Sequence, residues 1–156
     1  QLFWNQGPDQ RSCFTEVPPA TAGDLSRKLV GRGSAYADMD GDGDLDVLMM
    51  QVGRAPVLLR NDQALGRHWL RVRLEQPGMN PDAIGATLEL ETPDGGVLRR
   101  DVTPTRSYLS QSELPMIFGL GAEAQSTLTL RVRWPDGTAQ TVDASGSIDD
   151  TLVIAK

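Results

Sequence analysis

Apolar and polar residues alternate in several short runs, and this pattern constrains the fold of the chain more than any other feature. In residues 68–75, leucine and valine alternate with arginine and glutamate, and the same period returns in 87–91 and 127–134. Successive side chains of a strand point to opposite faces, so these runs predict half-buried β-strands with one charged face. Sustained helical periodicity is lacking, and residues 20–30 allow one turn at most. The sequence therefore predicts an all-β protein.

Two similar turn motifs separate some of these strands. Residues 93–96 read Pro-Asp-Gly-Gly, and residues 135–138 read Pro-Asp-Gly-Thr. Proline presets φ, aspartate accepts a hydrogen bond from its own backbone, and glycine tolerates a positive φ, so each motif suits a hairpin. The pattern predicts an antiparallel β-sandwich for residues 66–156. Its remaining strands are expected at 96–102, 115–118, 138–142 and 150–154.

Residues 1–65 differ, because their apolar runs are shorter and their loops are rich in glycine, aspartate and proline. A polar stretch at 61–66 lies between two apolar runs and marks the predicted boundary between two parts. A chain of 156 residues has room for one domain with a short additional module. Short strands in the first part are expected at 2–5, 13–17, 33–37, 45–51 and 56–60.

Residues 38–46, here called the aspartate loop, carry an aspartate at every second position, with Gly41 and Gly43 between them. Ca²⁺ takes six to eight oxygen ligands at variable angles, and short aspartate side chains on a curled backbone can supply them. Without a counter-ion, carboxylates this close together repel one another. We therefore predict one calcium ion, bound by four side chains and by the Asp44 carbonyl. The five aspartates are Asp38, Asp40, Asp42, Asp44 and Asp46.

An EF-hand is the nearest alternative to this assignment. That motif needs a bidentate glutamate at its twelfth position and helices on both sides. The twelfth position here is Met49, and the flanking residues have the composition of strands. Magnesium also fits less well, because it demands a strict octahedron and gives up its water reluctantly. The loop is thus predicted to connect two strands around a calcium ion.

Charge and cysteine content exclude several classes of function. The formal net charge is −6, from 21 acidic and 15 basic residues, which argues against nucleic-acid partners. No run of 18 apolar residues is present, so membrane insertion is not expected. Cys13 is the only cysteine, which rules out an intrachain disulfide and a cysteine zinc cluster.

The aspartate loop and its flanks, residues 35–48, resemble the calcium hairpin of FG-GAP/VCBS repeats, the blades of integrin-alpha-type propellers. Residues 2–5 and 14–17 resemble the preceding half-repeat. Later segments resemble the ASPIC/UnbV domain that follows such repeats in relatives of cartilage acidic protein. The resemblance implies a partial propeller-blade-like module, a secreted, periplasmic or cell-surface location, and adhesion-like recognition. The ASPIC/UnbV-like segments are 68–72, 83–86, 107–112, 118–121 and 132–137.

No catalytic constellation is evident in the sequence, so the chain is not expected to be an enzyme. His68 is the only histidine, and nothing in the sequence brings it to a serine nucleophile. The glycines at 119–121 are not followed by the lysine of a phosphate-binding loop. The polar stretch 106–112 is either a structural bulge or loop, which the pattern favours, or a binding edge. Its candidate ligand-binding residues are Arg106, Tyr108 and Gln111.

These observations predict a calcium-binding extracellular adhesion or interaction module with a structural Ca²⁺ ion. A carbohydrate-binding module is the alternative, and it would require exposed aromatic residues. A hydrolase accessory domain is the least favoured interpretation, because no general base is evident. The partner, a protein or a glycan, is not encoded in any recognisable motif. A propeller needs at least four blades, and residues 1–65 supply at most one and a half.

Overall fold

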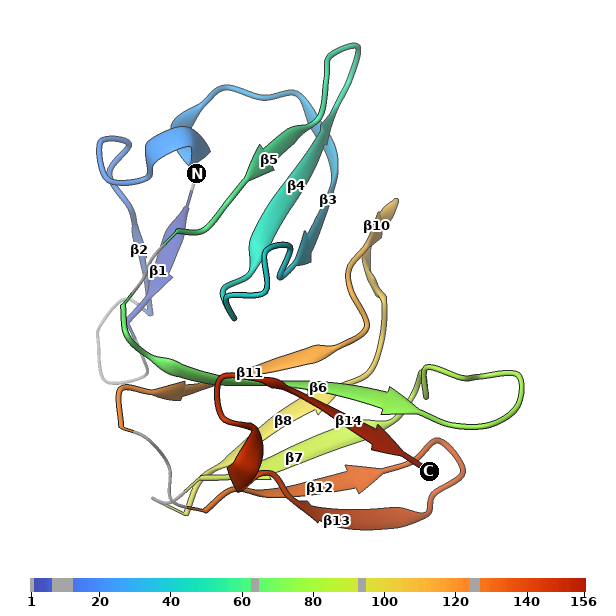
Figure 1. Ribbon diagram of the computed structural model, residues 1–156. Coiled ribbons are helices and arrows are strands. Elements are labelled where there is room, and N and C mark those ends of the chain that lie inside the picture. The colour runs from blue at the N-terminus through green and yellow to red at the C-terminus, as the bar shows by residue number, and fades with distance from the viewer. Residues whose placement is uncertain (1, 7–12, 63–64, 93–94, 124–126) are drawn as a thin grey trace.

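The computed structural model describes residues 2–6, 13–62, 65–92, 95–123 and 127–156. Strands dominate this part of the chain (Figure 1). Its helical content is limited to two short 3₁₀ helices, η1 (Gly23–Ser26) and η2 (Ser145–Ser147). Neither is long enough to cross a membrane. The all-β prediction is confirmed.

Two sheets pack face to face in the C-terminal part, with strand orders β11-β6-β14 and β13-β12-β7-β8. The predicted alternation is visible in β6, which buries Leu70, Val72 and Leu74 and turns arginines to the other face. The second turn motif also forms as expected, because Gly137 has a φ of +87° and its N–H donates to the Trp134 carbonyl. The strands are β6 (His68–Glu75), β7 (Thr87–Glu91), β8 (Val97–Asp101), β11 (Met116–Gly121), β12 (Thr129–Arg133), β13 (Ala139–Asp143) and β14 (Thr151–Ala155).

The first turn motif lies partly outside the described residues, since Pro93 and Asp94 are not among them. Gly95 has a φ of +82°, and its N–H donates to the Thr92 carbonyl. Strands β7 and β8 pair antiparallel on either side of this turn, with Glu91 opposite Val97.

One strand pair departs from the predicted antiparallel sandwich. Strand β14 runs parallel to β6, with Leu152 opposite Val72. The cause is a crossover, because η2 carries the chain from β13 in one sheet to β14 in the other. Apolar alternation sets which face of a strand is buried but carries no information on strand direction.

A single hydrophobic core fills the space between the two sheets. Phe118 is fully buried and lies opposite Leu70 in the β11–β6 ladder. Leucines and valines of β7 and β12 meet them from the other sheet. Among the described residues, every buried apolar side chain lies between Leu70 and Ile154. The N-terminal part therefore contributes no apolar residue to this core.

The N-terminal part contains two small antiparallel sheets. One is the hairpin of β1 (Phe3–Asn5) and β2 (Phe14–Glu16), and the other has the order β3-β4-β5. Strands β3 (Gly31–Ala37), β4 (Asp46–Gln51) and β5 (Val57–Leu59) lie where the sequence predicts them. The aspartate loop connects β3 to β4, as predicted.

A short hairpin of β9 (Thr105–Ser107) and β10 (Ser110–Gln111) leaves the sandwich and lies beside β3 (Figure 1). The Ser34 N–H donates to Ser110 Oγ at 3.1 Å, and the Tyr36 N–H donates to Ser112 Oγ at 3.2 Å. Alternate N–H groups of a strand point to the same edge, so serine hydroxyls here replace the carbonyls of a neighbouring strand. This contact joins the two parts of the molecule.

Candidate metal site

The backbone of the aspartate loop turns sharply between the paired residues Ala37 and Asp46. Gly41 has a φ of +80° and Gly43 a φ of +90°, a region that strains residues with a Cβ atom. The two glycines therefore adopt these angles without strain. They let the chain curl within nine residues.

Three of the predicted ligands come together. Carboxylate oxygens of Asp38, Asp40 and Asp42 all lie within 4.8 Å of one another. Asp38 is buried, whereas Asp40 and Asp42 are exposed. A Ca²⁺–O distance of about 2.3–2.6 Å allows two ligands of one ion to be up to about 5 Å apart. The three oxygens are thus close enough to share one calcium ion.

Asp38 also organises the backbone of the loop. Its Oδ1 accepts hydrogen bonds from the N–H groups of Gly41 at 2.8 Å and Asp42 at 3.1 Å. Its Oδ2 accepts one from the Gly43 N–H at 3.3 Å. These bonds wrap the loop around the Asp38 carboxylate and turn its N–H groups inward.

Asp46 lies outside the group of three. It is 1% exposed, and its two oxygens accept hydrogen bonds from the N–H groups of Met39 at 3.0 Å and Asn61 at 2.8 Å. Its carboxylate therefore connects the start of the loop to the segment after β5. No sequence pattern pairs Asp46 with Asn61, so this contact could not be foreseen.

Asp44 is also outside the group of three, although the electrostatics of the loop affect it. The pKa of Asp44 lies above its ordinary value, first because the side chain is partly buried. The second cause is the negative charge of the other aspartates, which in order of effect are Asp42, Asp38, Asp46 and Asp40. Its N–H donates to Asp42 Oδ1 at 2.9 Å. The part of this rise that comes from the neighbouring carboxylates is the repulsion that a cation would relieve.

Glu113 supports the loop from the sandwich. Its Oε1 accepts a hydrogen bond from the Asp38 N–H at 3.1 Å, and its Oε2 pairs with the Arg71 guanidinium of β6. Both side chains are largely buried, with exposed fractions of 11% for Glu113 and 23% for Arg71. The sequence shows Glu113 only as an isolated acid, so this link became apparent only in the structure.

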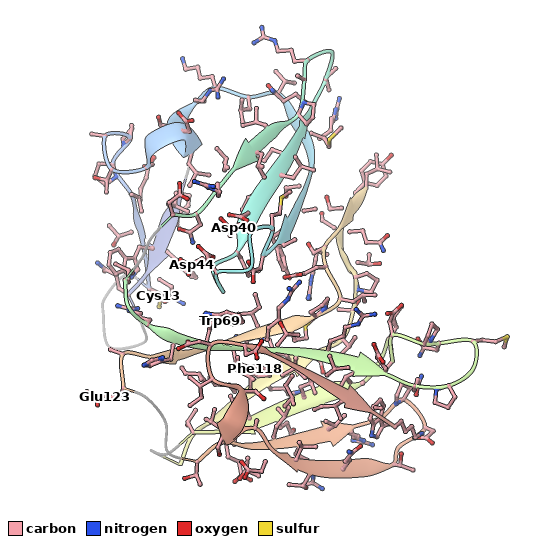
Figure 2. All side chains as sticks on the ribbon, viewed as in Figure 1. Cys13, Asp40, Asp44, Trp69, Phe118 and Glu123 are labelled. Carbon is pink, nitrogen blue, oxygen red and sulfur yellow. The ribbon has the colours of Figure 1, made fainter. Side chains whose placement is uncertain are left out.

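Trp69 of β6 supports the loop as well. Figure 2 shows its side chain between β6 and the loop that carries Asp40 and Asp44. A Cβ atom added to Gly43 would lie 2.3 Å from Cγ, Cδ1 and Cδ2 of the indole. The Trp69 ring thus packs directly on the Gly43 backbone, and glycine is required there for a second reason.

The candidate ligand-binding residues of the polar stretch are not gathered into one site. Tyr108 is 79% exposed, and Gln111 is exposed on β10. The Arg106 guanidinium lies 5.4 Å from the centroid of the Tyr36 ring and packs against β3. The structure therefore gives Arg106 a contact between the two parts of the molecule.

His68 does not meet a serine among the described residues. Its Nδ1 lies 2.7 Å from Asp149 Oδ2, and this hydrogen bond lowers the pKa of Asp149. Ser110 and Ser112 instead accept hydrogen bonds from β3. Cys13 is exposed and free.

Comparison with known proteins places these features in context. A family model described as ASPIC and UnbV matches residues 76–156. Cartilage acidic protein 1 of Xenopus tropicalis is 34% identical over 129 residues, which cover 80% of this chain and 20% of that protein. Cartilage acidic protein 1 of Homo sapiens is 31% identical over 128 residues, which cover 80% of this chain and 19% of that protein.

The chain therefore spans about a fifth of the length of these curated relatives. A match over 80% of 156 residues includes the aspartate loop wherever it begins, so the similarity extends beyond the family model into the N-terminal part.

Proposed function

The chain belongs to the ASPIC and UnbV family, and from its aspartate loop we propose that it is a calcium-binding extracellular interaction module. The observation that carries this proposal is the convergence of the Asp38, Asp40 and Asp42 carboxylates within 4.8 Å. A hard cation with flexible coordination suits an all-oxygen donor set on a curled loop. The role proposed for the ion is structural, and no reaction is assigned to the module.

The proposed ligands are the side chains of Asp38, Asp40, Asp42 and Asp46, together with the Asp44 carbonyl. The ion would supply positive charge to a loop whose carboxylates repel one another, and this repulsion contributes, after burial, to the raised pKa of Asp44. The chain's own residues supply the framework. Asp38 holds the loop N–H groups, and Glu113 holds the Asp38 N–H.

We also propose that residues 1–65 are an FG-GAP/VCBS-like repeat segment and that residues 66–156 are the ASPIC/UnbV-like sandwich. Three observations support this division. The loop lies between two antiparallel strands, a second hairpin precedes it, and the buried apolar core is confined to residues after the boundary.

A secreted, periplasmic or cell-surface location is part of the proposal. Two curated relatives are named for cartilage, and extracellular calcium modules function with dissociation constants of about 10⁻⁴–10⁻³ M. A weak site of this kind would be filled outside the cell. The partner class remains a protein or a glycan.

Calorimetry of chelator-stripped protein tests the proposal. We expect one calcium ion to bind per chain, with a dissociation constant of about 10⁻⁴–10⁻³ M or tighter. Calcium at a hundredfold excess over this constant should stabilise the part of the fold that contains the loop by about 2.7 kcal/mol, because it binds only the folded loop. Asp40→Asn should remove most of this effect. Asp24→Asn in η1 is the control and should leave it unchanged. Absence of calcium heat in the stripped wild-type protein would refute the proposal.

A further inference from the structure

A cleft of about 590 Å³ lies between the aspartate loop and the outer face of the β11-β6-β14 sheet. This volume is within the range of about 300–1,000 Å³ that small-ligand pockets occupy. Its polar side chains come from both parts of the molecule, and the calcium proposal gives a ligand role only to Asp42 and Asp44 among its lining residues. The lining residues are Asp42, Gly43, Asp44, Leu65, Gly66, Arg67, His68, Trp69, Gly119 and Gly121.

Glycines on β11 keep one side of the cleft open. Gly119 lies opposite Trp69 in the β11–β6 ladder, and Gly121 lies opposite His68. A Cβ atom at either glycine would meet no other atom within 4 Å. Side chains at these two positions would project into open space, so their absence leaves room beside the indole and the imidazole.

The lining combines an aromatic ring with hydrogen-bonding groups on two sides. Trp69 is half-buried, with Gly43 packed on its ring, and the rest of the indole contributes to the cleft. Asp44 supplies a carboxylate acceptor from the loop, because only its carbonyl is assigned to the calcium ion. Arg67 and His68 supply polar nitrogen atoms from the strand side. Asp149 fixes the orientation of His68 through Nδ1, which leaves Nε2 as its remaining polar atom.

We propose that this cleft binds a neutral saccharide unit. An aromatic ring flanked by a carboxylate and by polar nitrogen atoms suits a ligand with an apolar ring face and a rim of hydroxyl groups. A polyanionic glycan fits less well, because the chain carries a net charge of −6 and the acidic residue Asp44 lines the cleft. The inference names a partner class for the proposed module. It rests on the calcium proposal in one respect, because the bound ion would order residues 42–44, which line one side of the cleft.

Gly119→Leu is the variant that tests the site. The glycine is exposed and its added side chain meets open space, so leucine should fill the cleft without disturbing the fold. Gly146→Leu is the matched control, because Gly146 is also exposed, also has open space at its Cβ position, and lies outside the cleft. Both variants leave the aspartate loop intact.

The experiment titrates calcium-loaded protein with three neutral trisaccharides, namely cellotriose, mannotriose and triacetylchitotriose, and with an acidic hyaluronan tetrasaccharide. The indole N–H resonance of Trp69, assigned with Trp69→Phe, reports binding. We expect at least one neutral trisaccharide to shift this resonance and to bind more tightly than the acidic probe. Gly119→Leu should weaken that binding by about tenfold or more, equivalent to about 1.4 kcal/mol, whereas Gly146→Leu should not change it.

Three results would overturn the proposal. They are no response to any of the neutral trisaccharides, tighter binding of the acidic probe, and unchanged binding by Gly119→Leu. The calcium-dependent rise in melting temperature is measured on the same samples. If that rise is present without saccharide binding, only the cleft proposal fails. If the rise is absent, the calcium proposal fails, and the Trp69 response still decides whether the cleft binds a saccharide.

Discussion

Gly43 combines two constraints that can be separated by mutation. Its φ of +90° disfavours a side chain, and a Cβ atom would collide with the Trp69 indole at 2.3 Å. Gly41 in the same loop has a φ of +80°, but nothing lies within 4 Å of its Cβ position. Alanine at Gly41 therefore introduces only backbone strain, whereas alanine at Gly43 adds a steric clash with a ring held in the sheet.

We predict that Gly43→Ala destabilises the protein by about 1–3 kcal/mol more than Gly41→Ala does, since overpacking costs are of this size. Chemical denaturation of both variants measures the difference. Replacing Trp69 with alanine should remove the clash, so the two glycine substitutions should have similar effects in that background. If the two substitutions lowered the unfolding free energy equally in the wild-type background, the indole would not pack on Gly43.

Asp136 lies in the second turn motif, and its surface contact with Lys156 can be tested through its pKa. Hydrogen bonds from Lys156 and Thr138 lower the pKa of Asp136 to about 2. The folded-state pKa is below the ordinary value of 3.8, so the contact stabilises the fold at neutral pH. This stabilisation is lost as the pH falls from about 3.8 towards 2.

Lys156→Met should raise the pKa of Asp136 towards its ordinary value, because the strongest of these hydrogen bonds is removed. A titration of the Asp136 carboxyl carbon by NMR measures the shift. Lys28→Met, which changes a lysine near Arg54 in the N-terminal part, is the control. A pKa that stays near 2 in Lys156→Met would contradict the contact.

At the scale of elements, the sequence predicts strands well where one face is buried. The 68–75 and 127–134 runs become β6 and β12, because burial in a shared core enforces their period of two. Strands β9 and β10 were not predicted, since they are short, polar and exposed over most of their length. Their position depends on hydrogen bonds to β3, far away in sequence, which no local pattern encodes.

In the candidate site, too, the sequence predicts what depends on local spacing and does not predict what depends on contacts distant in sequence. Local spacing predicts the convergence of Asp38, Asp40 and Asp42, because the three lie on one tight loop. The supports from Trp69 and Glu113 come from other elements and depend on how the two parts of the molecule pack. Sequence reasoning therefore identified the loop but missed the residues that hold it in place.

Glu113→Gln tests the link between the loop and the sandwich. The substitution leaves an acceptor for the Asp38 N–H but removes the charge that pairs with the largely buried Arg71. We expect a loss of about 1.5–3 kcal/mol in unfolding free energy, typical of a hydrogen bond to a charged group. Calcium affinity should change little, because the loop contact is retained.

The control for Glu113→Gln is Arg99→Gln, which breaks an ion pair with Asp101 whose two side chains are both 60% exposed. Exposed pairs contribute about 1 kcal/mol or less, so this variant should be nearly as stable as the wild type. If the two variants lose the same stability, the Arg71–Glu113 pair has no special structural role.

At the scale of the whole molecule, stability is distributed unevenly. The buried apolar side chains all belong to the sandwich, while the N-terminal part exposes Trp4, Phe14 and Met50. In the N-terminal part, the buried residues among those described are the loop carboxylates Asp38 and Asp46. Regions with few buried apolar contacts open at lower free energy than the core does. The N-terminal part should therefore unfold locally while the sandwich stays folded.

Calcium should control this local opening. An ion that binds only the folded loop stabilises the unit containing that loop by RT ln(1 + [L]/Kd), and chelation removes this term. We predict that chelation accelerates amide hydrogen exchange in β3 and β4 of the 156-residue chain and leaves exchange in β6 and β12 unchanged. The Ser34 and Tyr36 amides of β3 donate hydrogen bonds to the Ser110 and Ser112 hydroxyls. These two amides should therefore be among those whose exchange accelerates. Equal acceleration in all four strands would mean that the two parts unfold as one cooperative unit, and the proposed boundary at residue 65 would then have no thermodynamic meaning.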